Sequence, residues 1–392
     1  MMLLDVTRNP ELPADLIRAY LESTGWHLQQ NFQLSTQAKE PKLLAKRWGA
    51  ARKYDVFYFG EPHPVELIVP RDSQTSDYHQ RVQDALRTLE AVEDRPQHEI
   101  ATEIRFINFD LLKSTIPNSY LTYDAIPLQS AVEHVGNLQE LLASSATTQI
   151  SPKAFYGRVR KAAVEYSERC LFGHTFKGSF GFTVQSPLLI ETSQPKLFEL
   201  DVPFERKVLS RLVTGLESIK VAQKENNLAA ALNPEDGLSA NGFDVLANLI
   251  EEAGGQISIE VAFSRRWQLQ TDRARVESFE FSAQTIEVSR EAADRLRATY
   301  KPALKTVVGR IINLRNTTDP SRLMQLAKSR DVVIDFEDED LGDIKVKVTL
   351  NASDYLRAVE AHKVGQRIAV DGLLERSGLR YMIQNPTQLR TL

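Results

Sequence analysis

The sequence predicts an α+β protein with several domains, and three observations support this fold class. Amphipathic helical segments are interspersed with strand-like segments, and the chain of 392 residues is long enough to bury more than one core. The segments fall into a helix–strand–helix group, a mixed group and a group of short strands. We therefore predict a small N-terminal domain at residues 1–99, a central α+β domain at 100–301 and a C-terminal β-barrel at 302–392.

The N-terminal segments have the order helix, three or four strands, helix, an α-β(3-4)-α arrangement. Residues 13–23 place Ile17 and Leu21 on one helical face, and Gly25 suits the end of that helix. Strands are predicted at residues 26–30, 43–48, 54–59 and 65–69, and a long amphipathic helix between residues 71 and 95.

This arrangement resembles the double-stranded-RNA-binding-type fold, in particular that of the small HicA-type toxins. The resemblance covers residues 13–95 and is carried by the helix ending in "GW", the strands ending in "ELIVPRD" and the helix behind them. In that family a ribonuclease histidine lies on the strand after the "GW" strand. Here the corresponding strand, residues 43–48, reads "LLAKRW" and has no histidine. The resemblance therefore implies the fold and not the ribonuclease activity.

The central segments mix helices with strands. The clearest helix begins at Pro203, carries a long apolar stripe and is expected to turn Arg206, Lys207 and Arg211 toward solvent. Ser239 is a candidate cap for another helix, which the glycines at residues 254–255 would end. The helix after Ser239 is predicted to cover residues 239–252. The other helices are predicted at residues 128–143, 152–170 and 289–300, and the strands at 104–109, 178–191, 257–263 and 276–281.

The C-terminal segments are three strands, one helix and two strands. The strands are predicted at residues 304–314, 331–337, 344–350, 366–375 and 379–383, and the helix at 353–362. This layout resembles the OB-fold, a five-stranded and partly open barrel. In the third strand, Ile344 and Val346 should face the core while Lys345 and Lys347 face outward.

Bulk properties exclude several classes of protein. The formal net charge of −4 excludes a globally basic nucleic-acid binder but leaves a local basic surface open. Cys170 is the only cysteine, so no internal disulfide can form. There is neither a signal-peptide pattern nor a run of ~18 apolar residues. We therefore expect a cytoplasmic protein with no membrane partner.

Cations and aromatic residues of the barrel strands are the first candidates for contact with nucleic acid. The third strand carries Lys345 and Lys347, the fourth carries Arg367, and the fifth carries Arg380 and Tyr381. OB-folds bind single strands through such cations and aromatic platforms. The acidic run "EDEDLGD" beside the second strand opposes phosphate and strand aromatics are few, so the pattern favours a packing or protein-docking barrel over one that binds nucleic acid.

Two basic clusters in the central segments are the other candidates for nucleic-acid binding. The candidate residues are Lys153, Arg160, Arg265, Arg266 and Trp267. The first two lie near Tyr156, and the two neighbouring arginines lie beside the tryptophan. Arginine next to an aromatic ring suits stacking on a base and binding of a phosphate, and it also suits a solvated helix face or a hairpin tip.

No motif of a catalytic, metal or cofactor site is present, so we predict no catalytic residue, no metal and no cofactor. The patterns HExxH, GxSxG and GxxxxGK[ST] are absent. Cys170 and His174 have the spacing of a helical ligand pair, but Gly173 lies between them and no second pair stands nearby.

Several runs resemble a set of uncharacterised bacterial proteins. These runs are "YLESTGW", "LIVPRDSQTSDYHQRVQDALRTLEAVEDR", "GSFGFTV", "PFERKV" and "LSANGF". The resemblance implies no particular activity. It suggests that the protein is associated with antiviral defence against phage.

Together these patterns favour a non-enzymatic, cytoplasmic binding or scaffold protein that acts in a complex. The expected partner is another protein or a second copy of the chain, and nucleic acid is the other candidate ligand. Two alternatives stay open. One is a nuclease or nucleotide-processing enzyme assembled from distant residues such as His174, Lys177 and Glu191. The other is a purely structural subunit.

Overall fold

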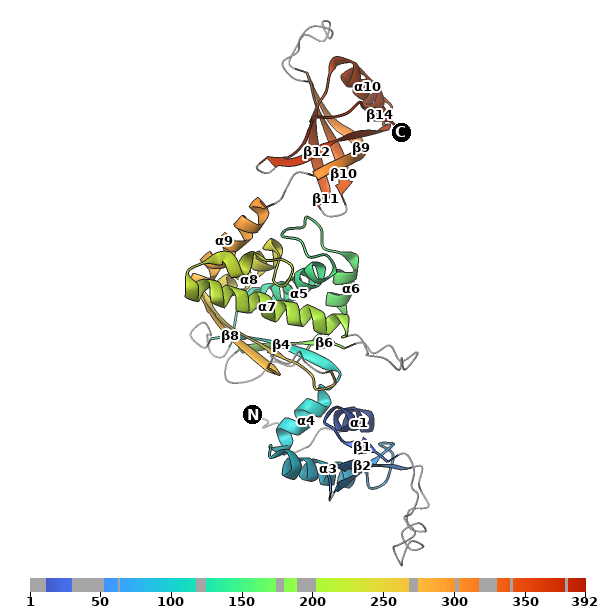
Figure 1. Ribbon diagram of the computed structural model, residues 1–392, viewed down its shortest axis with the longest axis vertical. Coiled ribbons are helices and arrows are strands. Elements are labelled where there is room, and N and C mark those ends of the chain that lie inside the picture. The colour runs from blue at the N-terminus through green and yellow to red at the C-terminus, as the bar shows by residue number, and fades with distance from the viewer. Residues whose placement is uncertain are drawn as a thin grey trace, which may run out of the picture. The chain divides into compact units, whose positions relative to one another are not determined.

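The computed structural model confirms the α+β multidomain class, with helices packed around three sheets within the residues that it describes (Figure 1). The described residues are 12–29, 53–62, 64–117, 125–173, 180–188, 202–267, 274–299, 303–316, 330–338, 341–377 and 380–392. The chain divides into two compact units. Unit 1 comprises residues 1–127, 168–213 and 256–281, and unit 2 comprises residues 128–167, 214–255 and 282–392. The domain boundaries predicted near residues 100 and 302 stay predictions.

The first part of unit 1 is a three-stranded antiparallel sheet with helices packed against it. Its elements are α1 (Ala14–Ser23), β1 (His27–Leu28), β2 (Tyr54–Phe59), β3 (Val65–Pro70), α3 (Tyr78–Glu93) and α4 (Gln97–Arg105). The strand order is β1-β2-β3, and Ile17, Phe57 and Leu89 are buried in one core. The predicted strand at residues 43–48 lies outside the described residues.

Helix α4 stands where the sequence predicted the start of a strand at residues 104–109, and that prediction is wrong. Pro96 precedes the helix, and Ile100 and Ile104 enter the core at helical spacing. The strand begins only at Phe109. A short apolar run is compatible with both a strand and one face of a helix. Here packing against α1 and α3 stabilises the helix.

The second sheet of unit 1 combines strands from distant parts of the chain. They are β4 (Phe109–Ile116), β5 (Leu171–Phe172), β6 (Phe180–Pro187), β7 (Gln256–Ala262) and β8 (Val276–Ser282), in the order β5-β6-β4-β7-β8. Because β4 is the central strand, Asp110, Leu112 and Ser114 have no exposed surface. Helix α7 (Phe204–Glu225) contributes residues 204–213 to this unit.

Unit 2 contains a group of helices before residue 299. They are α5 (Leu128–Ile150), α6 (Lys161–Arg169), the 3₁₀ helix η2 (Leu228–Leu232), α8 (Ala240–Glu252) and α9 (Ala283–Ala298). The predicted cap of α8 is confirmed, because Ser239 Oγ accepts a hydrogen bond from the Gly242 N–H at 3.4 Å. Gly254 and Gly255 follow α8 with positive φ, as predicted. Among the described residues, no helix is both long enough and apolar enough to cross a bilayer.

Helix α6 is much shorter than the helix predicted at residues 152–170. Residues 151–160 are irregular instead, because a side chain from α8 binds the backbone of Tyr156. The Asn241 amide accepts from the Tyr156 N–H at 3.2 Å and donates to the Tyr156 carbonyl at 3.0 Å. This long-range contact outweighs the local helical pattern.

The C-terminal strands of unit 2 pair in a closed circuit. They are β9 (Ala303–Asn316), β10 (Arg330–Asp338), β11 (Gly342–Thr349), β12 (Arg367–Ser377) and β13 (Arg380–Gln384). The pairing follows the order β9-β10-β11-β13-β12 and returns to β9, with β11 and β13 parallel. Helix α10 (Ala352–Lys363) contacts β9, β10 and β12, and a short β14 (Arg390–Thr391) pairs with β12 (Figure 1).

The alternation predicted for the third strand of this group is confirmed in β11. Ile344, Val346 and Val348 are buried in the core that the strands enclose, whereas Lys345 and Thr349 are exposed. All five strands and the helix lie close to their predicted ranges. Alternation is a property of neighbouring residues, which is why the sequence alone was sufficient here.

Gly309 allows β9 to approach β10 closely. A Cβ at this position would lie 1.9 Å from the Asp335 carbonyl oxygen and 2.8 Å from Ile334 Cγ2. We predict that Gly309→Val lowers the free energy of unfolding by about 1–3 kcal/mol or more, because the two backbones must separate. The midpoint of urea unfolding measures this loss.

Gly136→Ala is the matched control for this substitution. No atom outside its own helix lies within 4 Å of the added Cβ, and alanine favours a helix by up to ~1 kcal/mol over glycine. This variant should be at least as stable as the wild type. Wild-type stability in Gly309→Val would contradict the required close approach.

His134 on α5 makes stability depend on pH. The side chain is 1% exposed, and burial lowers its pKa to about 4. An unfolded histidine has a pKa of about 6.5, so between these two pH values the unfolded chain binds a proton that the folded chain does not. We predict that the free energy of unfolding falls as the pH drops from about 6.5 to about 4, by on the order of 3 kcal/mol from this group.

The variant His134→Gln isolates this contribution, because the carboxylates titrate in both proteins. Its free energy of unfolding, measured with urea across that pH range, should vary less than that of the wild type. His27→Gln, at an exposed position of β1, is the control and should follow the wild-type profile. Identical profiles for the wild type and His134→Gln would show that His134 does not contribute.

Candidate functional site

A pocket of about 620 Å³ in unit 1 is the candidate functional site. Residues of α4, β4 and β7 and of the segments next to them line it. Its apolar surface is formed by Phe106, Ile107, Phe109, Leu111, Ala262 and Phe263, and its charged rim includes Arg95, Glu99, Glu103, Lys113, Glu260, Arg265 and Arg275. An apolar surface bordered by a few charged groups is the usual composition of a ligand site.

A buried ion pair holds the segment that carries Arg265. Arg206 of α7 donates to Asp110 of β4 from Nε to Oδ2 at 2.6 Å and from Nη2 to Oδ1 at 2.8 Å. Arg206 is 2% exposed and Asp110 is 0% exposed. The Ser264 N–H donates to Asp110 Oδ1 at 2.8 Å, and Arg206 donates to the Ser264 carbonyl at 2.9 Å. The residues after β7 are therefore tied to this pair.

The surroundings of Arg206 explain how a charged side chain is held inside unit 1. Its guanidinium also lies over the ring of Phe263, 5.1 Å from the centroid. Burial raises the pKa of Asp110, and the Arg206 guanidinium and the Ser264 N–H oppose that rise. The expectation that Arg206 faces solvent is wrong, because an acid 96 positions away in the chain pairs with it inside the protein.

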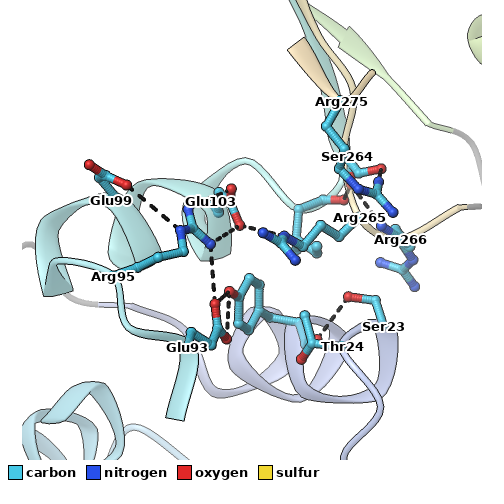
Figure 2. A network of polar contacts seen from close by, with 12 residues as sticks. Ser23, Thr24, Glu93, Arg95, Glu99, Glu103, Ser264, Arg265, Arg266 and Arg275 are labelled. Atoms are coloured by element: carbon cyan, nitrogen blue, oxygen red, sulfur yellow. Dashed lines mark hydrogen bonds and ion pairs between the residues drawn. The ribbon is translucent and has the colours of Figure 1, made fainter. Parts of the chain in front are cut away.

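Arginines and glutamates form a chain of ion pairs along one side of the pocket (Figure 2). Arg95 pairs with Glu103 at 2.8 Å, with Glu93 at 3.1 Å and with Glu99 at 3.7 Å. Arg265 donates from Nε to Oε2 of the same Glu103 at 2.8 Å. Glu103 therefore joins α4 to the segment after β7.

Two guanidiniums beside this chain form no ion pair with a carboxylate among the described residues. Arg275 donates to the Ser264 carbonyl at 2.9 Å, and Arg266 donates to Asn108 Oδ1. Burial lowers the pKa of both groups, and the charge of Arg265 lowers that of Arg275 further. Figure 2 shows Arg265, Arg266 and Arg275 gathered on the same side of the network. Arg266 and Arg275, which have no carboxylate partner among the described residues, are therefore candidates to receive an anion.

The structure brings some of the predicted central residues to this pocket. Arg265 lines it, and Arg266 is the next residue along the chain. Trp267 is half-buried, and its carbonyl accepts a hydrogen bond from Arg206 Nη1 at 3.4 Å. The tryptophan thus helps to anchor the segment that presents the two arginines.

The other two central candidates, Lys153 and Arg160, lie in unit 2. Both are half-buried on the irregular segment at residues 151–160. Tyr156, proposed from the sequence as their aromatic neighbour, is only 5% exposed, and burial raises the pKa of its hydroxyl to about 12. A buried ring offers no face to a base, so the stacking role considered for this cluster does not fit.

The cations of the C-terminal strands do not form an uninterrupted basic surface. The registers of β11, β10, β9 and β12 place Lys345, Asp335, Arg310 and Arg367 in one row, and all four are exposed. Asp335 therefore stands between the cations. A groove of about 300 Å³ lies on this row and is lined by two arginines and three carboxylates.

The other candidates on these strands differ in their burial and in their contacts. Lys347 pairs with Asp331 at 2.8 Å, and Tyr381 packs, partly buried, against the core. Arg380 is exposed at the start of β13.

Six charged residues of the pocket rim were not among the site residues predicted from the sequence. They are Arg95, Glu99, Glu103, Lys113, Glu260 and Arg275. Only Arg275 had a signal, because it belongs to the same basic run, "SRRWQLQTDRAR", as Arg265. Lys113 and Glu260 lie on neighbouring strands and pair at 2.6 Å. Their charges are those of ordinary outward-facing positions, and only the fold brings them to one pocket.

No set of metal ligands is found within the part of the chain that the structure describes. No three histidine, cysteine, aspartate or glutamate side chains there could hold a metal ion together. His174, Lys177 and Glu191, on which the nuclease alternative depends, lie outside the described residues.

Comparison with protein-family models, with curated proteins and with solved structures finds no match for this chain. The resemblances to the OB-fold and to the HicA-type toxins therefore stay predictions. The interpretation of the pocket depends on its own geometry and charge.

The buried pair behind the pocket should be decisive for stability. We predict that Arg206→Gln lowers the free energy of unfolding by about 3–5 kcal/mol, because it leaves Asp110 buried without a cation. Urea unfolding measures the loss. The control is Arg81→Gln, which breaks a partly exposed pair with Asp77 at 3.1 Å and should cost under about 1 kcal/mol. Similar losses in the two variants would refute the special role of the buried pair.

Proposed function

We propose that this chain is a cytoplasmic binding protein that takes a single-stranded nucleic acid in the pocket of unit 1 and acts within a complex. The observation that carries the proposal is Arg275. Its guanidinium is half-buried beside an apolar pocket and forms no ion pair with a carboxylate among the described residues. A guanidinium in this situation gains strongly from a phosphate, which accepts paired, charge-assisted hydrogen bonds.

The two parts of the pocket match the two chemistries of a nucleotide. Bases stack on aromatic and apolar surfaces, and Phe106 and Phe109 provide partly exposed rings. Phosphates bind guanidiniums, and Arg265 and Arg275 lie on the rim. A volume of about 620 Å³ is in the range of sites for small ligands and accommodates a nucleotide.

A single strand fits this arrangement better than a duplex. A base reaches an apolar protein surface only when it is unstacked from its neighbours, as in loops and single strands. Duplex binding depends instead on an extended positive surface, whereas the rim of this pocket interleaves arginines with Glu99 and Glu103.

The barrel supports the second part of the proposal, which is binding to a partner. We propose that it is an OB-fold, because the strand circuit β9-β10-β11-β13-β12 and helix α10 between the third and fourth strands agree with that fold. Asp335 interrupts its row of cations, and Glu337 and Asp343 line the same groove, so the surface carries mixed charge that does not suit a polyphosphate. Such a surface complements a protein face of mixed charge, on another protein or on a second copy of the chain.

Fluorescence anisotropy with labelled oligothymidylate and oligouridylate tests the nucleic-acid part. We predict salt-dependent binding by the wild type between about 50 and 200 mM salt. Arg275→Gln should bind more weakly, and the slope of log affinity against log salt should become shallower by about 0.7, the value for one phosphate contact with a single strand.

Arg367→Gln, in the barrel, removes the same charge and is the matched control, so it should keep the wild-type slope. A labelled duplex should bind more weakly than the single strands. Absence of salt-dependent binding at micromolar protein would overturn the proposal. A loss confined to Arg367→Gln would instead place the nucleic acid on the barrel.

A further inference from the structure

We infer that Glu103 is an internal competitor of the nucleic acid: its carboxylate occupies the place of a ligand phosphate between Arg95 and Arg265, and binding transfers Arg265 from Glu103 to the phosphate. This inference depends on the proposed function of the unit 1 pocket. It identifies Glu103 as a residue that controls the affinity of that pocket for the nucleic acid.

Glu103 receives the two arginines as a phosphate group would. Arg95 donates from Nη2 to Oε1 at 2.8 Å and from Nη1 to Oε2 at 3.1 Å, and Arg265 donates from Nε to Oε2 at 2.8 Å. Guanidiniums bind carboxylates and phosphates with the same forked geometry. The carboxylate therefore marks an anion position between two connecting segments of unit 1, the one that joins α3 to α4 and the one after β7 (Figure 2).

The two arginines depend on Glu103 to different degrees. Arg95 also pairs with Glu93 at 3.1 Å and with Glu99 at 3.7 Å. Arg265 pairs with no carboxylate other than Glu103 among the described residues. An anion that displaces Glu103 therefore gains Arg265, while Arg95 keeps its other acids.

Arg275 extends this anion position toward the ligand. It lies near enough to Arg265 for the two charges to interact, and both side chains line the pocket. Once Arg265 leaves Glu103, the two guanidiniums face the pocket together. They then suit the phosphate of a nucleotide whose base lies on the apolar surface.

The exchange of partners is energetically accessible because the pair is partly exposed. The side chains of Arg265 and Glu103 are 32% and 35% exposed, and ion pairs at such exposure are weak. Water can solvate the released carboxylate. A single-stranded nucleic acid gains free energy from base stacking as well as from its phosphate contact. It therefore displaces the internal carboxylate, which gains nothing from stacking.

Removal of the competing charge should tighten binding. We expect Glu103→Gln to bind labelled oligothymidylate on the order of fivefold more tightly than the wild type. Its salt slope should equal that of the wild type, because Arg265 contacts a phosphate in both complexes. A merely structural role of Glu103 would weaken binding instead.

Three further variants test the assignment. Glu99→Gln removes the same charge from the same pocket, but among the described residues Glu99 pairs only with Arg95, so affinity should change by less than about twofold. Glu103→Asp keeps the charge and should show no gain. The double variant Glu103→Gln with Arg265→Gln should lose the gain, because the arginine that Glu103 releases is missing. Circular dichroism melting of each variant verifies that it is folded.

The outcomes separate this inference from the proposed function. If the wild type binds and Arg275→Gln weakens binding, but Glu103→Gln binds no more tightly, the inference is overturned and the proposed function stands. If neither the wild type nor Glu103→Gln binds in a salt-dependent way, both are overturned. An equal gain in Glu99→Gln and Glu103→Gln would reduce the effect to general charge and would also overturn the inference.

Discussion

The buried pair of Asp110 and Arg206 is the interaction on which the candidate site depends. It joins the central strand β4, the first turn of α7 and the residues after β7, which lie far apart in the sequence. Two buried charges are tolerated only when each satisfies the other and the remaining hydrogen bonds are made. Here the Ser264 backbone supplies a donor to Asp110 and an acceptor to Arg206. The segment that carries Arg265 is therefore anchored in the interior of unit 1, in addition to its partly exposed pair with Glu103.

At the rim of the pocket, one carboxylate pairs with two arginines. Glu103 receives both Arg95 and Arg265, whereas Arg275 pairs with no carboxylate among the described residues. Half-buried cations without acids are costly to the folded protein, as the lowered pKa of Arg275 indicates. Partly buried cations without a carboxylate partner, when they lie at the rim of a pocket, are typical of sites that bind a charged ligand. The proposed competition between Glu103 and a phosphate is based on this sharing of one carboxylate by two arginines.

The C-terminal strands and the pocket show why the number of cations alone does not describe a surface. Strands β9, β11 and β12 present Lys345, Arg310 and Arg367 in one row, but the same register inserts Asp335 among them. The pocket has acids as well, yet one of its arginines stays without an ion pair in the described part of unit 1 and lies beside an apolar surface. What matters is therefore the pairing of each charge, and pairing follows from strand register and packing.

Elements that depend on neighbouring residues could be predicted from the sequence. Alternation located the five main strands of the C-terminal group and the inward face of β11, and local capping chemistry located α8 behind Ser239. The packing of distant segments decided that Ile104 belongs to a helix, that Tyr156 is buried and that Arg206 lies inside unit 1. It also decided that Glu103 meets Arg265 across 162 positions of chain. Periodicity and caps are read within a few residues, whereas the partner of a charged side chain is chosen by the packing of distant segments, which no local pattern contains.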